Sequence, residues 1–233
     1  MDITVRYTER ANHAKEICAK DLKPGDYDCV VAISGDGLIH EIVNGFCHRA
    51  DWTSDLKDSM TIGFIPGGTG NALASSVLKH TNENYGVQEA AFLVAKGRRM
   101  FMDITELDGE YEDRKIYSFL STAWAIIGDC DINSEAIRWA GSIRFTLWGV
   151  MRVLFMQRYM GCFNFNGFYV KNKKDIPEND LIPVEMPVLQ KHAVTNNWFL
   201  HFFAGNTPWI SSDMHYLPLS RLNDGMNDII YQK

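Results

Sequence analysis

The chain of 233 residues contains no apolar run of the ~18 residues that a membrane-spanning helix requires. Its N-terminus, MDITVRYTER, lacks the apolar core of a secretory signal peptide. The five cysteines form no C-x-x-C pair, which argues against a zinc site or a disulfide framework and favours a reducing compartment. These absences predict a soluble, cytoplasmic protein that touches membranes only peripherally.

Basic residues are also in short supply. The 23 lysines and arginines are outnumbered by 29 aspartates and glutamates, and the net charge of −6 argues against nucleic acid as the main partner. A few local arginines can still bind an anionic ligand. The hydrophobic share of 46% is ordinary for a globular protein, so the chain can form one large domain or two small ones.

The first hundred residues alternate between strand-like and helix-like segments. Apolar or alternating runs predict strands over 3–8, 29–33 and 61–66. Helical spacing predicts helices over 11–22, 38–49, 70–79 and 84–97, the last with Gly97 as its C-cap. This alternation is typical of a mostly parallel sheet covered by helices, so we expect an α/β domain over residues 1–100.

After residue 100 the pattern becomes mainly β. A hairpin of two long strands is predicted over 101–128 around DGEYED, with further strands over 162–170, 198–205 and 228–233. A helical stretch over 134–161 interrupts them, and residues 171–187 have the composition of a charged loop. We place the domain boundary near residue 100 and expect a mainly β domain over residues 101–233.

Two glycine-rich loops follow adjacent predicted strands. The first, SGDGLIHEIVNG at residues 34–45, places Asp36 between Gly35 and Gly37. Parallel sheets bind ligands at the carboxyl ends of their strands, and glycines let a ligand approach the backbone closely. The alternative is a plain tight turn in which Asp36 is the N-cap of the next helix.

The second loop, PGGTGNALA at residues 66–74, opens the next predicted helix. Its free amide groups and the positive helix end favour phosphate oxygens. The loop is neither the G-x-G-x-x-G fingerprint nor the Walker pattern. The two loops together, one of them carrying an exposed carboxylate, predict phosphoryl transfer to a hydroxyl group.

These loops resemble the diacylglycerol-kinase catalytic superfamily of lipid kinases. The sphingosine-kinase branch is the most similar, because YTERANHA at 7–14 resembles its segment along the nucleotide. AWAIIGDCDINSEAIRWAGSIRFT at 123–146 resembles its lipid-head recognition region. The resemblance implies an α/β, phosphofructokinase-like nucleotide domain with a mostly parallel sheet. A mainly β, sandwich-type lipid-binding domain with a helical insert would follow it.

The resemblance also implies roles for single residues. Asp36 matches the catalytic base, and ATP and Mg²⁺ are the implied cofactors, although the sequence shows no all-protein metal cage. The implied ATP-binding residues are Thr8, Glu9, Arg10, Ala11, Asn12, Glu41, Gly68, Thr69, Gly70, Arg138 and Arg144. The implied residues for binding the lipid substrate are Ser34, Gly35, Asp36, Gly37, Asp131, Ile126, Ile127 and Phe145.

The residues of the lipid region also have structural interpretations. Asp131, implied to hold the lipid's amino group, is also a suitable N-cap for INSEAIRW, and Glu135 and Arg138 have the spacing of a surface pair. Arg144 falls in the first turn of a helix after Ser142, where the helix dipole disfavours a cation that has no anion to bind. The helix that follows is apolar on more than one face, which fits either a core helix or a lipid tunnel.

Both ends depart from the family pattern. The family begins with a strand and a phosphate loop upstream of the match to Met1, and it continues past Lys233 to a later D-G-E element. We therefore expect this chain to be a fragment of the family sequence, truncated at both ends. Asp224–Gly225 resembles an earlier D-G motif, or forms only a hairpin turn.

The lead hypothesis is an ATP-dependent kinase that phosphorylates the primary hydroxyl of sphingosine or a related sphingoid base, giving sphingosine 1-phosphate. A diacylglycerol or ceramide kinase is the alternative, but those substrates offer Asp131 no ammonium group. A truncated, inactive lipid-binding module is a third possibility. An NAD kinase is a less favoured hypothesis, because nothing in NAD explains the apolar helix beside Asp131. The expected partners are the lipid, ATP and a transient membrane surface, and the oligomeric state stays open.

Overall fold

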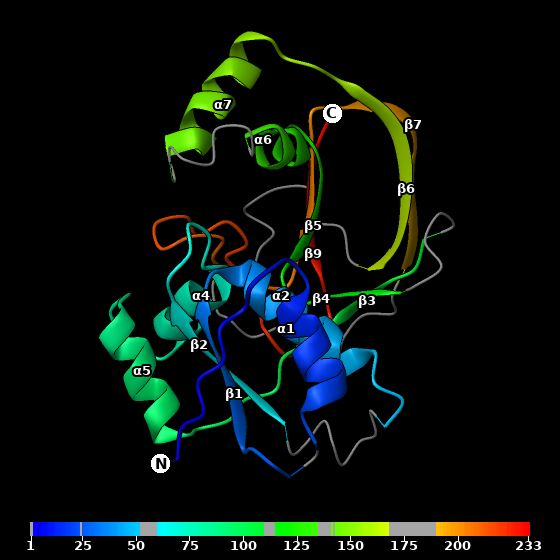
Figure 1. Ribbon diagram of the computed structural model, residues 1–233. Helices are drawn as coiled ribbons and strands as arrows, with labels where there is room; N and C mark the ends of the chain where they lie inside the picture. Colours follow the sequence, from blue (N-terminus) through cyan, green and yellow to red (C-terminus); the bar gives the residue numbers. More distant parts are fainter. Residues whose placement is uncertain are drawn as a thin grey trace. The chain divides into compact units, whose positions relative to one another are not determined.

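The computed structural model describes residues 2–23, 25–51, 60–109, 115–134, 141, 143–167 and 190–233. The chain divides into two compact units, drawn in Figure 1. The first unit comprises Met1–Thr122 and Gly205–Asp228, and the second comprises Ala123–Ala204 and Ile229–Lys233. The first unit therefore extends past residue 100, where sequence analysis places the domain boundary, and includes a segment from the C-terminal part of the chain.

The first unit contains the predicted parallel pair of strands. Strand β1 (Cys29–Ser34) pairs with β2 (Thr61–Pro66), in register from Cys29 opposite Thr61 to Ser34 opposite Pro66. Helix α2 (Asp36–Cys47) follows β1, and α4 (Ala72–His80) follows β2. Helix α5 (Val87–Lys96) ends at Gly97, whose φ of 65° confirms the predicted left-handed cap.

The predicted first strand, over 3–8, is wrong, because residues 2–9 have no regular structure. Thr4, Arg6 and Thr8 line a cavity of about 160 Å³ together with residues of β1. The segment has no ladder partner, and among the described residues β1 pairs with β2 alone. Helix α1 (His13–Glu16) follows and continues as the π-helical turn η1 (Ile17–Asp21), within the predicted helix 11–22.

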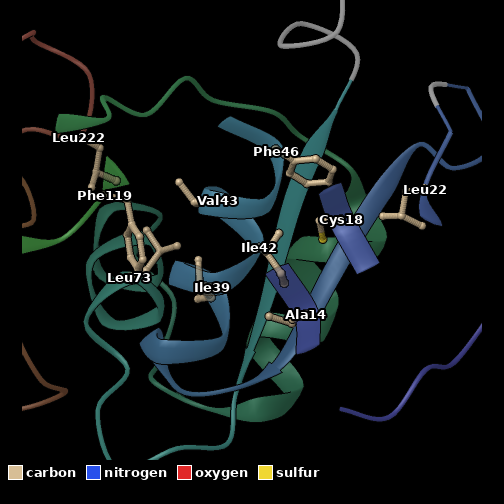
Figure 2. Packing of buried hydrophobic residues seen from close by; sticks show 11 residues of the cluster. Ala14, Cys18, Leu22, Ile39, Ile42, Val43, Phe46, Leu73, Phe119 and Leu222 are labelled. Atoms are coloured by element: carbon tan, nitrogen blue, oxygen red, sulfur yellow. The ribbon is translucent and has the colours of Figure 1, made fainter. Parts of the chain in front are cut away.

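Helix α2 lies at the centre of the hydrophobic core. Its buried residues recur at helical spacing, which gives the helix one apolar stripe. Figure 2 shows Ile42 beside Ala14 and Cys18 of the N-terminal helices, while Val43 lies toward Phe119. Gly45 permits the close approach of α1, because a Cβ there would lie 2.7 Å from both the Cys18 Cβ and the Lys15 carbonyl oxygen.

Asn44 joins α2 to strand β4 (Ile116–Ser118). Its amide nitrogen donates to the Tyr117 carbonyl at 2.8 Å and to the His40 carbonyl at 2.9 Å, and its oxygen accepts the Tyr117 N–H at 3.0 Å. Asn44 is 3% exposed. The side chain therefore satisfies both backbone groups of Tyr117, as a neighbouring strand would.

The predicted hairpin of the first unit is shorter than expected. Strand β3 (Thr105–Leu107) pairs antiparallel with β4, and residues 110–114 lie outside the described residues. The predicted second long strand does not continue to 128, because residues 121–125 form the separate strand β5 (Ser121–Ala125) and a helix begins at Ile126. Asp224–Gly225 forms a turn: Gly225 has φ 74° and donates its N–H to Asp103 at 2.5 Å.

The second unit contains two helices and the remaining strands. Helices α6 (Ile126–Ser134) and α7 (Ile143–Leu154) pack together, with 135–140 and 142 outside the described residues. The predicted helical stretch 134–161 is wrong at its end, where β6 (Tyr159–Gly167) begins and pairs antiparallel with β7 (Gln190–Phe199). Strands β8 (His201–Gly205) and β9 (Asp228–Gln232) form a sheet with β5, in the order β5-β8-β9.

Aromatic rings form the core of the second unit. Phe163 lies 5.7 Å from Phe199 and 5.1 Å from Tyr231 between ring centroids, and Trp124 lies 5.6 Å from Phe199. The predicted loop 171–187 and the end of the predicted strand 162–170 lie outside the described residues. Within the described ranges, none of the helices combines the length and apolar character needed to cross a membrane.

The two glycine-rich loops of the first unit touch each other through their backbones. A Cβ built on Gly68 would lie 2.4 Å from the Gly35 Cα and 2.6 Å from the Gly35 nitrogen. A Cβ on Gly35 would lie 2.7 Å from the Gly70 carbonyl oxygen. No side chain fits at either position, so these glycines are required by the contact between the loops. Gly37 differs, because its Cβ would meet nothing within 4 Å.

Replacement of Asn44 tests the link between α2 and β4. We expect Asn44→Ala to lower the free energy of unfolding by about 2 kcal/mol or more, since each buried polar group left unpaired costs ~1–3 kcal/mol. Urea unfolding measures this change. Asn84→Ala, at an exposed position, is the matched control. Equal losses in the two variants would contradict the structural role of Asn44.

The contact between the loops predicts opposite results at two neighbouring glycines. Gly68→Ala must separate the loops and should destabilise the protein by ~1–3 kcal/mol, the usual cost of overpacking. Gly37→Ala lies in open space within the first turn of α2, and alanine there should stabilise by ~0.4–1 kcal/mol. Thermal unfolding of both variants measures the difference. A Gly68→Ala protein as stable as the wild type would show that the loops do not touch.

Candidate active site

Asp36 bridges the two glycine-rich loops. It is the first residue of α2, but its carboxylate accepts the N–H of Ala72 at 2.6 Å and of Leu73 at 3.2 Å, both in the first turn of α4. Its own N–H donates to the Gly70 carbonyl at 3.1 Å. The interpretation of Asp36 as the N-cap of its own helix is therefore wrong, since it caps the helix that follows the other loop.

Opposing effects determine the proton affinity of Asp36. Burial raises the pKa of its carboxyl group, while the hydrogen bonds from Ala72 and Leu73 act in the opposite direction. Burial is the larger effect, so the pKa of Asp36 is raised above its ordinary value. Two N–H donors occupy only part of the acceptor capacity of a carboxylate, which has about four lone-pair positions. Asp36 is thus a fixed carboxylate that can still accept a proton.

The turn at residues 68–71 is closed by Asn71. The Gly68 N–H donates to the Asn71 side-chain oxygen at 3.2 Å, and the Asn71 amide nitrogen donates to the Gly68 carbonyl at 2.6 Å. Because Asp36 occupies the amides of Ala72 and Leu73, those groups are not open to phosphate. Among the described residues, the amides of Thr69 and Gly70 donate no hydrogen bond, so they can receive an anion.

The segment Thr8–Asn12 is exposed and is attached to α2 at its end. Glu41 of α2 accepts the N–H of Asn12 at 2.9 Å and the N–H of Ala14 at 3.1 Å. Arg10 forms two hydrogen bonds with the carboxylate of Glu16, at 2.9 and 2.6 Å. The structure therefore places three predicted groups on the first unit: the Asp36 loop and the loop at 66–74, which touch each other, and residues 8–12, which are attached to the same helix α2 through Glu41.

The other predicted residues belong to the second unit. Asp131 lies inside α6, so the interpretation of this residue as a helix N-cap is wrong. Arg144 and Phe145 are in the first turn of α7, as expected, and Ile126 and Ile127 begin α6 and are partly buried. Arg138, with Glu135 and Ser142, lies outside the described residues.

Asp129, two residues before Asp131, is already paired. It accepts a hydrogen bond from the Tyr159 hydroxyl, and its carboxylate lies 3.1 Å from the Arg152 guanidinium. These contacts connect α6 to α7 and β6. Asp129 has no recognisable sequence pattern, because its partners Arg152 and Tyr159 follow it by 23 and 30 residues.

Two polar residues near Asp36 were also missed. Asn71 had a usable signal, since asparagine after a glycine-rich turn often caps the following helix. Tyr85 had no such sequence signal. Burial raises the pKa of this tyrosine, its hydroxyl shares a hydrogen bond with the Asn71 side chain, and the Asp36 carboxylate lies nearby.

In the part of the chain that the structure describes, no three His, Cys, Asp or Glu residues are grouped to hold a metal ion.

Comparison with known proteins identifies relatives for the whole chain. The profile of the diacylglycerol kinase catalytic domain matches residues 1–107. Sphingosine kinase 2 of Arabidopsis thaliana is 30% identical across 100% of this chain and 50% of its own length. Sphingosine kinase 1 of Mus musculus is 31% identical across 96% of this chain and 62% of its own. This chain thus spans about half the length of the Arabidopsis relative.

Solved structures agree on the fold. A putative diacylglycerol kinase from Bacillus anthracis str. Sterne superposes with a TM-score of 0.61 at 15% identity, over 96% of this chain and 62% of that chain. At this identity the likeness concerns the fold alone. The profile match contains both glycine-rich loops and identifies residues 1–107 as a diacylglycerol kinase catalytic domain, and the relatives that are similar to nearly the whole chain are named sphingosine kinases.

Proposed function

We propose that the protein is an ATP-dependent lipid kinase that phosphorylates the primary hydroxyl of a sphingoid base. The observation that carries this proposal is the position of Asp36. Its carboxylate has a raised pKa, is fixed by Ala72 and Leu73, and sits beside a turn with two open amides. Several relatives of the chain are named sphingosine kinases, which supports the same class of substrate.

In the proposed reaction, Asp36 accepts the hydroxyl proton as the hydroxyl oxygen forms its bond to the γ-phosphorus. The bond between that phosphorus and the bridging oxygen breaks, and ADP leaves with the electron pair. Asp36 requires little basicity, because a loose transition state depends more on position and charge than on deprotonation. Its two hydrogen bonds to α4 supply that position.

The first unit has features that fit ATP. The amides of Thr69 and Gly70 would receive phosphate oxygens, and the open space at Gly37 admits a ligand to the backbone. The exposed residues 8–12 would line the nucleoside side. ATP supplies the phosphoryl group when it is bound. Mg²⁺ would be held mainly by phosphate oxygens, because the described residues offer no cluster of protein ligands for it.

The second unit has features that fit a lipid with an amino group. The resemblance to the sphingosine-kinase branch implies that Asp131 of α6 would pair with the ammonium group. Helix α7 has an exposed apolar stripe, which would contact the lipid tail or the membrane surface from the cytoplasm. The stripe consists of Ile143, Leu147, Val150, Met151 and Leu154, which are 48–69% exposed.

The direct test offers three lipids in parallel to the longest natural form of the protein, with ATP and Mg²⁺. Phosphorylation of sphingosine, but not of N-acylsphingosine or diacylglycerol, is the expected result. Preference for either of the other lipids would make the protein a ceramide or diacylglycerol kinase. Calorimetry would identify an inactive module, which would bind lipid and not ATP.

Asp36→Asn tests the proton acceptor. The variant should remain folded and lose turnover by roughly 10²–10⁴-fold, the usual contribution of a general base. In the wild type, kcat/KM should fall with decreasing pH as Asp36 becomes protonated, and this limb should lie at higher pH than for an ordinary aspartate, because the pKa is raised. Near-normal turnover in the folded variant would exclude Asp36 as the base.

Asp131→Asn tests the choice of lipid. Loss of the charge should weaken sphingosine binding by ~2–5 kcal/mol if the pair is buried, and by far less if it is exposed. The KM for ATP should stay unchanged, because Asp131 would contact the lipid and not the phosphates. The measurement is steady-state kinetics with each substrate varied in turn. An unaltered KM for sphingosine would remove Asp131 from the lipid site.

A further inference from the structure

We infer that Glu41 is a positioning residue: it fixes residues 8–12 on α2 through backbone amides and does not itself contact the nucleotide. The inference rests on the proposed function, in which residues 8–12 line the nucleoside side. It assigns to Glu41 a role different from the direct nucleotide contact that resemblance alone implies.

Each carboxylate oxygen of Glu41 accepts one backbone N–H from the N-terminal segment. One oxygen of Glu41 accepts the N–H of Asn12 at 2.9 Å, and the other accepts the N–H of Ala14 at 3.1 Å. The two donors are 29 and 27 residues away from Glu41 in sequence, so these bonds connect separate segments. Asn12 and Ala14 flank the start of α1, where backbone amides have no partner within the helix.

Asn12 needs such support, because its backbone is left-handed, with φ 62°. A residue with a side chain adopts this conformation at some energetic cost, and asparagine does so more readily than most. The conformation turns the amides of Asn12 and Ala14 toward one carboxylate. Only a carboxylate offers an acceptor oxygen to each of them, since an amide side chain has a single oxygen. Glutamine at position 41 would therefore leave one amide facing an NH₂ group.

Glu41 and Asp36 both belong to α2 and act in the same way at different places. Asp36 holds the first amides of α4, and Glu41 holds the amides that begin α1. Farther along α2, Gly45 allows α1 and η1 to pack closely against the same helix. Helix α2 thus sets the position of residues 8–12 and of the proposed base at the same time.

The first measurement needs no nucleotide and no lipid. Amide hydrogen exchange is compared between the wild type and Glu41→Gln, residue by residue. The amides of Asn12 and Ala14 should exchange at least about tenfold faster in the variant, equivalent to ~1.4 kcal/mol of lost protection. The amides of Ala72 and Leu73, held by Asp36, should not change and serve as internal references. Unchanged exchange at Asn12 and Ala14 would overturn the inference.

The second measurement is kinetic. Glu41→Gln should raise the KM for ATP by about tenfold and leave the KM for sphingosine unchanged, because only the nucleoside side loses its support. A general loss of stability would instead change both KM values together. Glu106→Gln, which breaks an exposed pair with Lys115, is the matched control and should alter neither KM. A raised KM for ATP without faster exchange would mean that Glu41 contacts the nucleotide directly, and would also overturn the inference.

Glu41→Asp keeps the charge but shortens the side chain by one methylene group, so it reaches at most one of the two amides. It should give an intermediate increase in exchange, and it replaces Glu41→Gln if that variant does not fold. The two proposals fail separately. Faster exchange in a protein that does not phosphorylate sphingosine would support the positioning role and reject the kinase.

Discussion

The contact between Gly35 and Gly68 is the constraint on which the rest of the site depends. It brings two loops from adjacent strands so close that neither can carry a side chain there. At that separation the Asp36 N–H reaches the Gly70 carbonyl, and the Asp36 carboxylate reaches the first turn of α4. Gly35 and Gly68 are therefore needed by the protein itself, whereas the position of Gly37 has open space beside it.

Helix α2 transmits this constraint to the rest of the first unit. Its buried stripe, shown in Figure 2, packs between the N-terminal helices and the residues around Phe119. Its polar residues make the longer connections: Asn44 holds the backbone of Tyr117, and Glu41 holds the start of α1. A single helix thus determines where the proposed base lies and where the segment beside it lies.

The sequence predicted those features whose cause is local. Strands at 29–33 and 61–66, their parallel pairing and the cap at Gly97 follow from apolar runs, spacing and one glycine. The predicted strand over 3–8 is wrong, because a strand also needs a neighbour to pair with, and among the described residues β1 pairs with β2 alone. The glycine-rich motif identified Asp36 as a candidate site residue. It did not identify Ala72 as the hydrogen-bond partner of Asp36, since the two residues are 36 positions apart in the sequence.

The occupied N-terminus of α4 changes how the second loop can act. A free helix start would offer its first amides to phosphate, as the glycine-rich sequence predicts. Here two of those amides already hold the Asp36 carboxylate, and a phosphate at the same place would meet a negative charge. In the proposed function, phosphate oxygens would therefore bind the amides of Thr69 and Gly70, which precede the occupied amides in the chain. Such a position would leave the hydrogen bonds between Asp36 and α4 intact, as the proposed acceptor of the hydroxyl proton requires.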